Sequence, residues 1–250
     1  SKARKKELNQ YSFVVKTIVT TELMRNIAEH YGVHCDETLT GFKWICDLIN
    51  RYESGELQGN RQFICGGEES YGFLAGNFVR DKDAVMSCAI AAEMVAFYKK
   101  QGKTLLDVLD TLYVRHGLYQ EDLYTLTLPG HEGALRIQAL MEVLRKSPPQ
   151  AVGGIDVKIL RDFANSQEYT CQKTAFTPSA SLCFPSSNVL QFQLADDSRI
   201  SIRPSGTEPK IKFYFSVYQK VADKNDLDKA KALANQKLEL LKAAFVNLAK

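Results

Sequence analysis

The segment RPSGTEPKIK (203–212) combines residue types that bind phosphate. Arg203 can donate two parallel hydrogen bonds to phosphate oxygens, and Lys212 alternates with apolar residues, which places it on the polar face of a strand. The residues between them offer hydroxyl and backbone N–H groups that can close around an anion: Ser205, Gly206 and Thr207. A solvated loop is the alternative, because Ser-Gly-Thr is common in turns. Spacing alone supports the two readings about equally.

A second candidate segment, CGGEESYGF (65–73), follows a strand-like stretch. If this loop is extended, Glu68 and Ser70 point the same way and Glu69 points the opposite way. A carboxylate beside a hydroxyl can hold adjacent sugar hydroxyls, and two glycines favour close approach of a ligand. A plain surface turn is the alternative.

Two lysines stand near the starts of predicted helices: Lys43 in TGFKW (40–44) and Lys82 in VRDKDA (79–84). Helix starts attract anions, although a single lysine there is more often solvent-facing. The four histidines and six cysteines show no metal-ligand spacing, so we expect no metal site in this chain. We expect the cysteines to be reduced and buried.

The amino-terminal half alternates strand-like and helix-like patterns. A threonine pair is expected to cap the first helix, and the helix at 83–100 is apolar almost all round, which predicts burial. The expected strands are 13–19, 33–35 and 61–65, and the expected helices are 23–31, 42–55, 83–100 and 104–117. This order predicts an α/β domain with a mixed, largely parallel sheet over residues 1–118.

The carboxy-terminal half changes to a run of strands closed by helices. Strands are expected at 123–128, 155–160, 189–194, 200–202 and 211–217, and helices at 132–145 and 226–248. The last helix repeats an apolar face. We therefore predict an α+β domain with an antiparallel sheet packed by helices over residues 119–250.

Composition excludes several functions. The net charge of +3, from 32 basic and 29 acidic residues, gives no basic stripe for nucleic acid. No apolar run approaches the roughly 20 residues of a membrane span, and the first seven residues lack the h-region of a secretory signal. We expect a cytoplasmic protein without nucleic-acid or membrane partners.

Four motifs in order, TGFK, GGEESYG, RDKD and RPSGTEPKIK, resemble the α-D-phosphohexomutase superfamily, in its bacterial phosphoglucomutase/phosphomannomutase branch. The resemblance runs over the entire chain but covers only the third and fourth of four domains, the fourth with a fold like the TATA-binding protein. The serine motif TASHN and the magnesium loop DxDxDR of the first two domains are absent, since TPSAS (177–181) lacks the histidine. The resemblance therefore implies a carboxy-terminal fragment.

By this resemblance, Glu68 and Ser70 bind hydroxyls of the sugar. Lys43 and Lys82 are basic catalytic residues that face the cleft around which the family's four domains lie. The phosphate that is not transferred is held by Arg203, Ser205, Gly206, Thr207 and Lys212. Many relatives have arginine at position 212, and lysine loses the bidentate grip. Mannose-tolerant relatives often have Gly-His where this chain has Tyr71-Gly72, which favours glucose and leaves mannose and pentose phosphates open.

The implied reaction moves a phosphoryl group between O1 and O6 of a hexose through glucose 1,6-bisphosphate, as intermediate and activator, with Mg²⁺ bound outside this chain. The implied partners are a phosphosugar substrate and the missing amino-terminal domains of the same polypeptide, without which the fragment is expected to be inactive. A phosphopentomutase and a non-catalytic phosphosugar-binding module are the alternatives. A nucleic-acid-binding domain is disfavoured by the charge.

Overall fold

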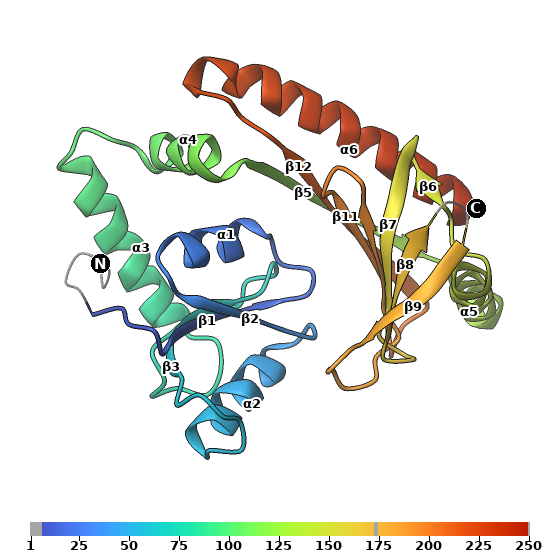
Figure 1. Ribbon diagram of the computed structural model, residues 1–250, viewed down its shortest axis with the longest axis horizontal. Helices are drawn as coiled ribbons and strands as arrows, with labels where there is room; N and C mark the ends of the chain where they lie inside the picture. The colour runs from blue at the N-terminus through green and yellow to red at the C-terminus, as the bar shows by residue number, and fades with distance from the viewer. Residues whose placement is uncertain (1–6, 173–174, 250) are drawn as a thin grey trace. The chain divides into compact units, whose positions relative to one another are not determined.

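The computed structural model describes residues 7–172 and 175–249, with the side chains of 248 and 249 left out, and it divides into two compact units (Figure 1). Unit 1 comprises residues 1–117 with 221–224, and unit 2 comprises residues 118–220 with 225–250. Residues 1–6 of the amino-terminal segment considered above, and the side chain of Leu248 on the last helix, lie outside the described part.

Unit 1 is built on a four-stranded sheet in the order β2-β1-β3-β4. Its strands are β1 (Ser12–Thr17), β2 (His34–Thr38), β3 (Gln62–Gly67) and β4 (Phe73–Ala75), and its helices are α1 (Leu23–His30), α2 (Phe42–Glu53), α3 (Ala84–Lys99) and α4 (Leu105–His116). The first two strands and β3 run parallel, and β4 pairs antiparallel with β3. The predicted mixed, largely parallel sheet is confirmed.

Side chains of β1 alternate between the two faces of this sheet, as the strand geometry requires. Phe13 and Val15 pack in a buried cluster with Ile45 and Ile49 of α2. Val14 packs in a second cluster with residues of α1 and β2. The two helices therefore cover opposite faces, and the carboxyl ends of the parallel strands are left to carry loops.

The starts of three helices test the predicted caps. Asp83 accepts a 3.0 Å hydrogen bond from the backbone three residues later, and Thr104 forms a capping box at the start of α4. The threonine pair does not cap α1 as predicted, because Glu22 occupies the residue before the helix and makes no side-chain cap. Thr21 still accepts a hydrogen bond of 3.2 Å from the Leu23 amide.

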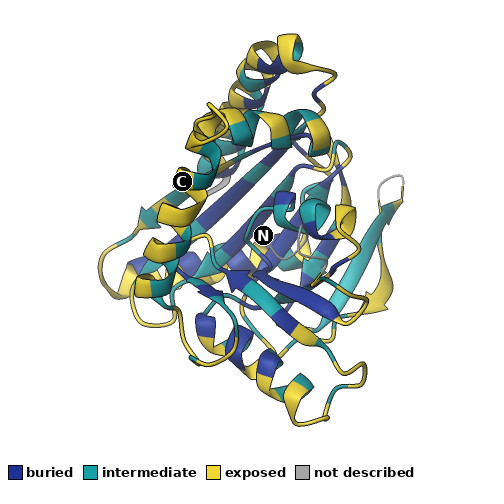
Figure 2. Cartoon of the chain, turned by 90° about the vertical axis from the view of Figure 1, so that its left-hand side faces the viewer, coloured by how far each residue is buried: buried dark blue, intermediate teal, exposed yellow. Residues whose placement is uncertain are grey.

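Helix α3 is exposed, so the prediction that it is buried is wrong. None of its residues is buried, and Val85, Met94 and Val95 are 83%, 41% and 47% exposed. Its sheet neighbour is β4, and a three-residue strand presents too little surface to cover a 16-residue helix. In Figure 2 exposed residues are drawn in yellow, in contrast to the dark blue of the buried strands.

We expect Val85→Lys to change the free energy of unfolding of the 250-residue chain by no more than about 0.5 kcal/mol, because the side chain has little packing to lose. The matched control is Ile49→Lys on α2, where the side chain is 1% exposed and a charge would be buried without a partner. Chemical denaturation measures both. Equal destabilisation by the two variants would show that α3 is covered in solution.

Unit 2 is a continuous antiparallel sheet in the order β5-β12-β11-β10-β7-β8-β9, with β6 paired to β7. Its strands are β5 (Leu118–Thr127), β6 (Ala151–Val152), β7 (Ile155–Asp162), β8 (Gln167–Gln172), β9 (Ala175–Ser181), β10 (Leu190–Leu194), β11 (Arg199–Pro204) and β12 (Lys210–Gln219). Its helices are α5 (Gly130–Lys146) and α6 (Leu227–Ala249), with the short 3-10 turn η1 (Lys224–Asp226) at the unit boundary. The predicted antiparallel sheet packed by helices is confirmed.

The core of unit 2 lies between the sheet and α6. Phe245 of α6 is 1% exposed, and its ring lies 5.7, 6.2 and 6.5 Å from the rings of Phe192, Phe213 and Phe215. The buried face of α6 is the one that the sequence predicts. It comprises Leu227, Ala230, Ala234, Leu238, Leu241 and Phe245.

The cysteines are not all buried. Cys35 and Cys46 are buried as predicted, whereas Cys88 and Cys183 are exposed, the former because it lies on α3. No disulfide joins cysteines in the described residues.

No helix among residues 7–172 and 175–249 has both the length and the apolar composition needed to cross a bilayer.

Candidate functional site

The predicted phosphate residues lie on one hairpin of unit 2. Strand β11 ends at Pro204, and the turn is closed by a 2.8 Å hydrogen bond from the Ser205 amide to the Lys210 carbonyl. Within the described residues the amides of Gly206 and Glu208 donate no hydrogen bond. The Thr207 amide makes only a long 3.5 Å bond to the Ser205 hydroxyl, whose own proton is therefore available. The tip thus has several donors that the described chain leaves without a strong acceptor.

Arg203 and Lys212 are register partners on adjacent strands, so their side chains lie on the same face of the sheet. Both are half-buried, and neither makes an ion pair or a side-chain hydrogen bond in the part of the chain that the structure describes. Like charges directly opposite each other destabilise a ladder. By contrast, Lys210 is neutralised by an ion pair with Glu208. An anion bound by Arg203 and Lys212 would relieve their repulsion.

A cavity of about 780 Å³ lies between this turn and α5. Ser205, Gly206 and Thr207 line it, but Arg203 and Lys212 do not. A Cβ added to Gly206 would meet no atom within 4 Å, so the fold itself does not require glycine there. The space beside this residue is open to a ligand.

The predicted sugar residues lie on a turn of unit 1 that follows β3. The turn is closed by a 2.8 Å bond from the Glu68 amide to the Gly72 carbonyl, and Tyr71 has a φ of 54°. The loop is therefore not extended as predicted. Glu68 is half-buried, and its Oε1 accepts a 2.7 Å bond from the Gly41 amide at the start of α2. A Cβ on Gly72 would lie 2.7 Å from Glu68 Oε2, so a larger residue at this position would displace this carboxylate from where it lies.

Ser70 and Glu69 are joined rather than opposed. The Ser70 hydroxyl donates to Glu69 Oε1 at 3.1 Å, and both residues are exposed. The prediction that Glu69 points away from Ser70 is wrong because the chain turns at this point.

A cavity of about 710 Å³ is lined by one of the two predicted lysines and by residues of the turn 68–72. Lys82 lines it together with Glu68, Tyr71 and Asp83, whereas Lys43 and Ser70 do not. Lys82 pairs with Asp81 at 3.1 Å, and the hydrogen bond from the Lys82 amide lowers the pKa of that carboxyl group. Lys43 is exposed, with its Nζ 4.7 Å from the centroid of the Trp44 ring.

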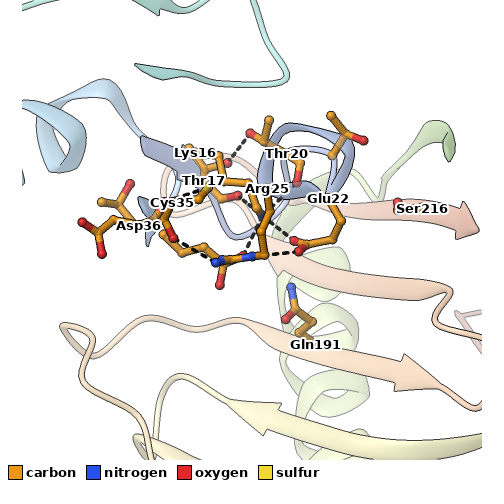
Figure 3. Close-up of polar contacts among 12 residues, drawn as sticks. Lys16, Thr17, Thr20, Glu22, Arg25, Cys35, Asp36, Gln191 and Ser216 are labelled. Atoms are coloured by element: carbon orange, nitrogen blue, oxygen red, sulfur yellow. Dashed lines mark hydrogen bonds and ion pairs between the residues drawn. The ribbon is translucent and has the colours of Figure 1, made fainter. Parts of the chain in front are cut away.

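Sequence reasoning missed a buried charge cluster at the carboxyl end of β1 (Figure 3). The Lys16 side chain is 0% exposed, and its Nζ lies 2.6 Å from a carboxylate oxygen of Glu22 and 2.6 Å from one of Glu37. Arg25 pairs with both glutamates. The available signal was a lysine among the apolar residues of the predicted strand 13–19, because a charge buried in such a strand must be paired. Cys35 lies near this cluster, and its own burial raises the pKa of its thiol to about 11.

No group of three or more histidine, cysteine or acidic side chains able to hold a metal ion occurs among the described residues. By the resemblance, the Mg²⁺ of the family is bound outside this chain.

Comparison with known proteins agrees with the motifs. Residues 1–116 match the family model described as phosphoglucomutase/phosphomannomutase, alpha/beta/alpha domain III. Proteins named phosphoglucomutase from Staphylococcus aureus strains bovine RF122 / ET3-1 and USA300 are 38% identical over 208 residues, which cover 83% of this chain and 36% of each relative. The chain thus spans about a third of the length of these relatives.

Two solved structures share the fold. The open form of pp63/parafusin, a phosphoglucomutase from Paramecium, is similar with a TM-score of 0.60 and 18% identity, over 94% of this chain and 37% of that one. A putative phosphomannomutase from Thermus thermophilus has a TM-score of 0.51 and 17% identity, over 94% and 38%.

Proposed function

Because the chain belongs to the phosphoglucomutase/phosphomannomutase family of α-D-phosphohexomutases, we propose that it holds the phosphosugar in an enzyme that interconverts hexose 1-phosphate and hexose 6-phosphate. The observation that carries the proposal is the Arg203–Lys212 pair. Two half-buried cations stand in register without a counter-ion in the described chain, beside a turn with open amide and hydroxyl donors. A phosphate group satisfies both the charges and the donors.

In this proposal each unit has its own task. Arg203, Lys212 and the turn 205–207 hold the phosphate that is not transferred. Glu68 and Ser70 bind hydroxyls of the sugar ring, with Glu68 set in place by the Gly41 amide. Lys82, on the cavity that Glu68 also lines, adds positive charge near the substrate, and Lys43 takes the same role from the start of α2.

The transfer step itself needs a nucleophile and a metal ion. We propose that a serine nucleophile and Mg²⁺ belong to residues outside this chain, in the part of the relatives' length that the chain does not span. When bound, the metal would neutralise charge on the phosphoryl oxygens. A bisphosphorylated sugar such as glucose 1,6-bisphosphate would then reverse its orientation in the site between the two transfers. This explains why phosphate and sugar hydroxyls need separate binding groups.

The Tyr71-Gly72 pair beside Glu68 supports a preference for glucose. The alternatives are a phosphopentomutase and a phosphosugar-binding module without catalysis. Comparing the affinities of glucose 6-phosphate, mannose 6-phosphate and ribose 5-phosphate would rank the substrates, because only the hexoses form a six-membered ring and the two hexoses differ at C2.

We expect inorganic phosphate to bind the 250-residue chain with a Kd of roughly millimolar, because several charge-assisted bonds are offset by lost translational freedom. Arg203→Ala should abolish this binding. Lys210→Ala is the matched control and should do less, since Lys210 is already paired with Glu208. Titration followed by amide NMR signals measures all three proteins. If phosphate shifts no amide between 203 and 212, or if Arg203→Ala binds like the parent chain, the proposed phosphate site is wrong.

A further inference from the structure

The carboxylate of Glu69 is held from two sides. Thr17, the last residue of β1, is 0% exposed, and its hydroxyl donates to Glu69 Oε2 at 3.3 Å. The Ser70 hydroxyl donates to the other oxygen, Oε1, at 3.1 Å. One hydroxyl comes from the buried sheet and the other from the turn that binds sugar in the proposed function. Glu69 therefore connects the sheet to Ser70.

The proton count fixes the direction of each bond in this chain of hydroxyls. An ionised carboxylate only accepts hydrogen bonds, and a hydroxyl has a single proton to donate. Thr17 gives its proton to Glu69, so in the 2.9 Å contact between Thr17 Oγ1 and Thr20 Oγ1 the donor must be Thr20. By the same argument Ser70 donates its only hydroxyl proton to Glu69. Toward a ligand, the Ser70 oxygen can therefore only accept a hydrogen bond.

We propose that Glu69 is a positioning residue that makes Ser70 a hydrogen-bond acceptor, so that Ser70 selects a sugar hydroxyl able to donate. The proposal rests on the proposed function, in which Ser70 binds the sugar. Glu69 itself contacts the substrate only through Ser70. Its neighbour Glu68 is a carboxylate and also accepts, so the turn binds a sugar edge whose two hydroxyls both donate.

The far end of the chain of hydrogen bonds is rigid, which is what positioning requires. Lys16 Nζ donates to the carbonyl oxygen of Thr20 at 3.1 Å and lies 3.3 Å from that of Thr17. Two glutamates hold the same ammonium group. Figure 3 shows Lys16, Thr17 and Thr20 together at the end of this strand. The Thr17 hydroxyl therefore reaches Glu69 from a fixed place.

Fluorinated sugars test the direction of the bond at Ser70. In 3-deoxy-3-fluoro and 4-deoxy-4-fluoro glucose 6-phosphate, fluorine can accept weakly but cannot donate. Because both hydroxyls of the bound edge donate, we expect each analogue to bind the parent chain about tenfold more weakly than glucose 6-phosphate, by calorimetry or NMR. In Glu69→Ala the Ser70 proton is released, so for the analogue whose fluorine faces Ser70 this ratio should fall below about threefold, while the ratio for the analogue that faces Glu68 stays unchanged. Glu69→Gln keeps one accepting oxygen and should lie between the two.

Two further variants separate positioning from a general loss of structure. Thr17→Val removes the donor to Glu69 with little change of shape and should lower the ratio, whereas Thr21→Val, outside the chain of bonds, should leave it unchanged. Melting temperatures check that each variant is folded. Inorganic phosphate should bind all of them equally, because its proposed ligands lie in unit 2.

The outcomes are distinct for the two proposals. If neither phosphate nor glucose 6-phosphate binds the parent chain, the proposed function fails. If glucose 6-phosphate binds but neither fluoro analogue binds more weakly, or if the ratios of both analogues are the same in the parent and Glu69→Ala, the inference about Glu69 is overturned.

Discussion

Phe245→Ala is expected to destabilise unit 2 by about 3–5 kcal/mol, the usual range for truncating a fully buried aromatic side chain. The ring is 1% exposed and lies against three phenylalanines of β10 and β12. Strands β10 and β12 lie on either side of β11 within the sheet. The truncation would therefore leave a cavity over inner strands, where the surrounding side chains cannot readily move to fill it.

The matched control for this variant is Leu240→Ala on the same helix. Leu240 is 60% exposed, and its truncation should change stability by less than about 0.5 kcal/mol. Hydrogen exchange of amides in β10–β12 measures the effect within unit 2 alone, which matters because two units need not unfold in one transition. A cost below about 1 kcal/mol for Phe245→Ala would contradict the assignment of the core.

The alternation of residues in unit 2 was enough to predict its central strands and their inner face. Phe213 and Phe215 alternate with polar residues, and a strand with one buried face keeps such a pattern. Strands β8 and β9 were missed. Residues of β8 are mostly half-buried on both faces, and β9 contains Pro178 and several small polar residues, so neither shows a clear period of two.

Helix α3 shows what composition cannot predict. Its apolar residues can be buried, but whether they are depends on the surface that the rest of the chain offers, and β4 offers little. Exposed apolar residues are common enough that hydrophobicity alone does not establish burial. The same helix carries the exposed Cys88, so the wrong prediction for that cysteine has the same cause, whereas the exposed Cys183 lies outside this helix.

For the candidate site, the sequence could indicate which loops carry the polar residues but not how those residues bond. The Arg203–Lys212 pairing follows from a hairpin whose two strands were both predicted. The contacts of Glu68 with Gly41 and of Glu69 with Ser70 depend on a closed turn with a positive φ at Tyr71, for which tyrosine gives no signal.

Lys16→Met is expected to cost unit 1 about 3 kcal/mol. The charges in the cluster balance, with Lys16 and Arg25 against Glu22 and Glu37, and removal of the lysine leaves one carboxylate in excess. Breaking a buried ion pair from one side costs about 3–5 kcal/mol. The lower end applies because the Glu22 and Glu37 side chains are 17% and 25% exposed, so water can reach them.

Two comparisons make this prediction specific. Lys158→Met replaces an exposed strand lysine and should change stability by less than about 0.5 kcal/mol. Adding Glu37→Gln to Lys16→Met restores the charge balance and should recover about 1 kcal/mol or more, a coupling that denaturant titration of the four proteins would resolve. Equal costs for Lys16→Met and Lys158→Met would contradict the buried cluster. Because Lys16 also bonds the carbonyl oxygens of Thr17 and Thr20, the variant should loosen the support of Glu69 even when unit 1 stays folded.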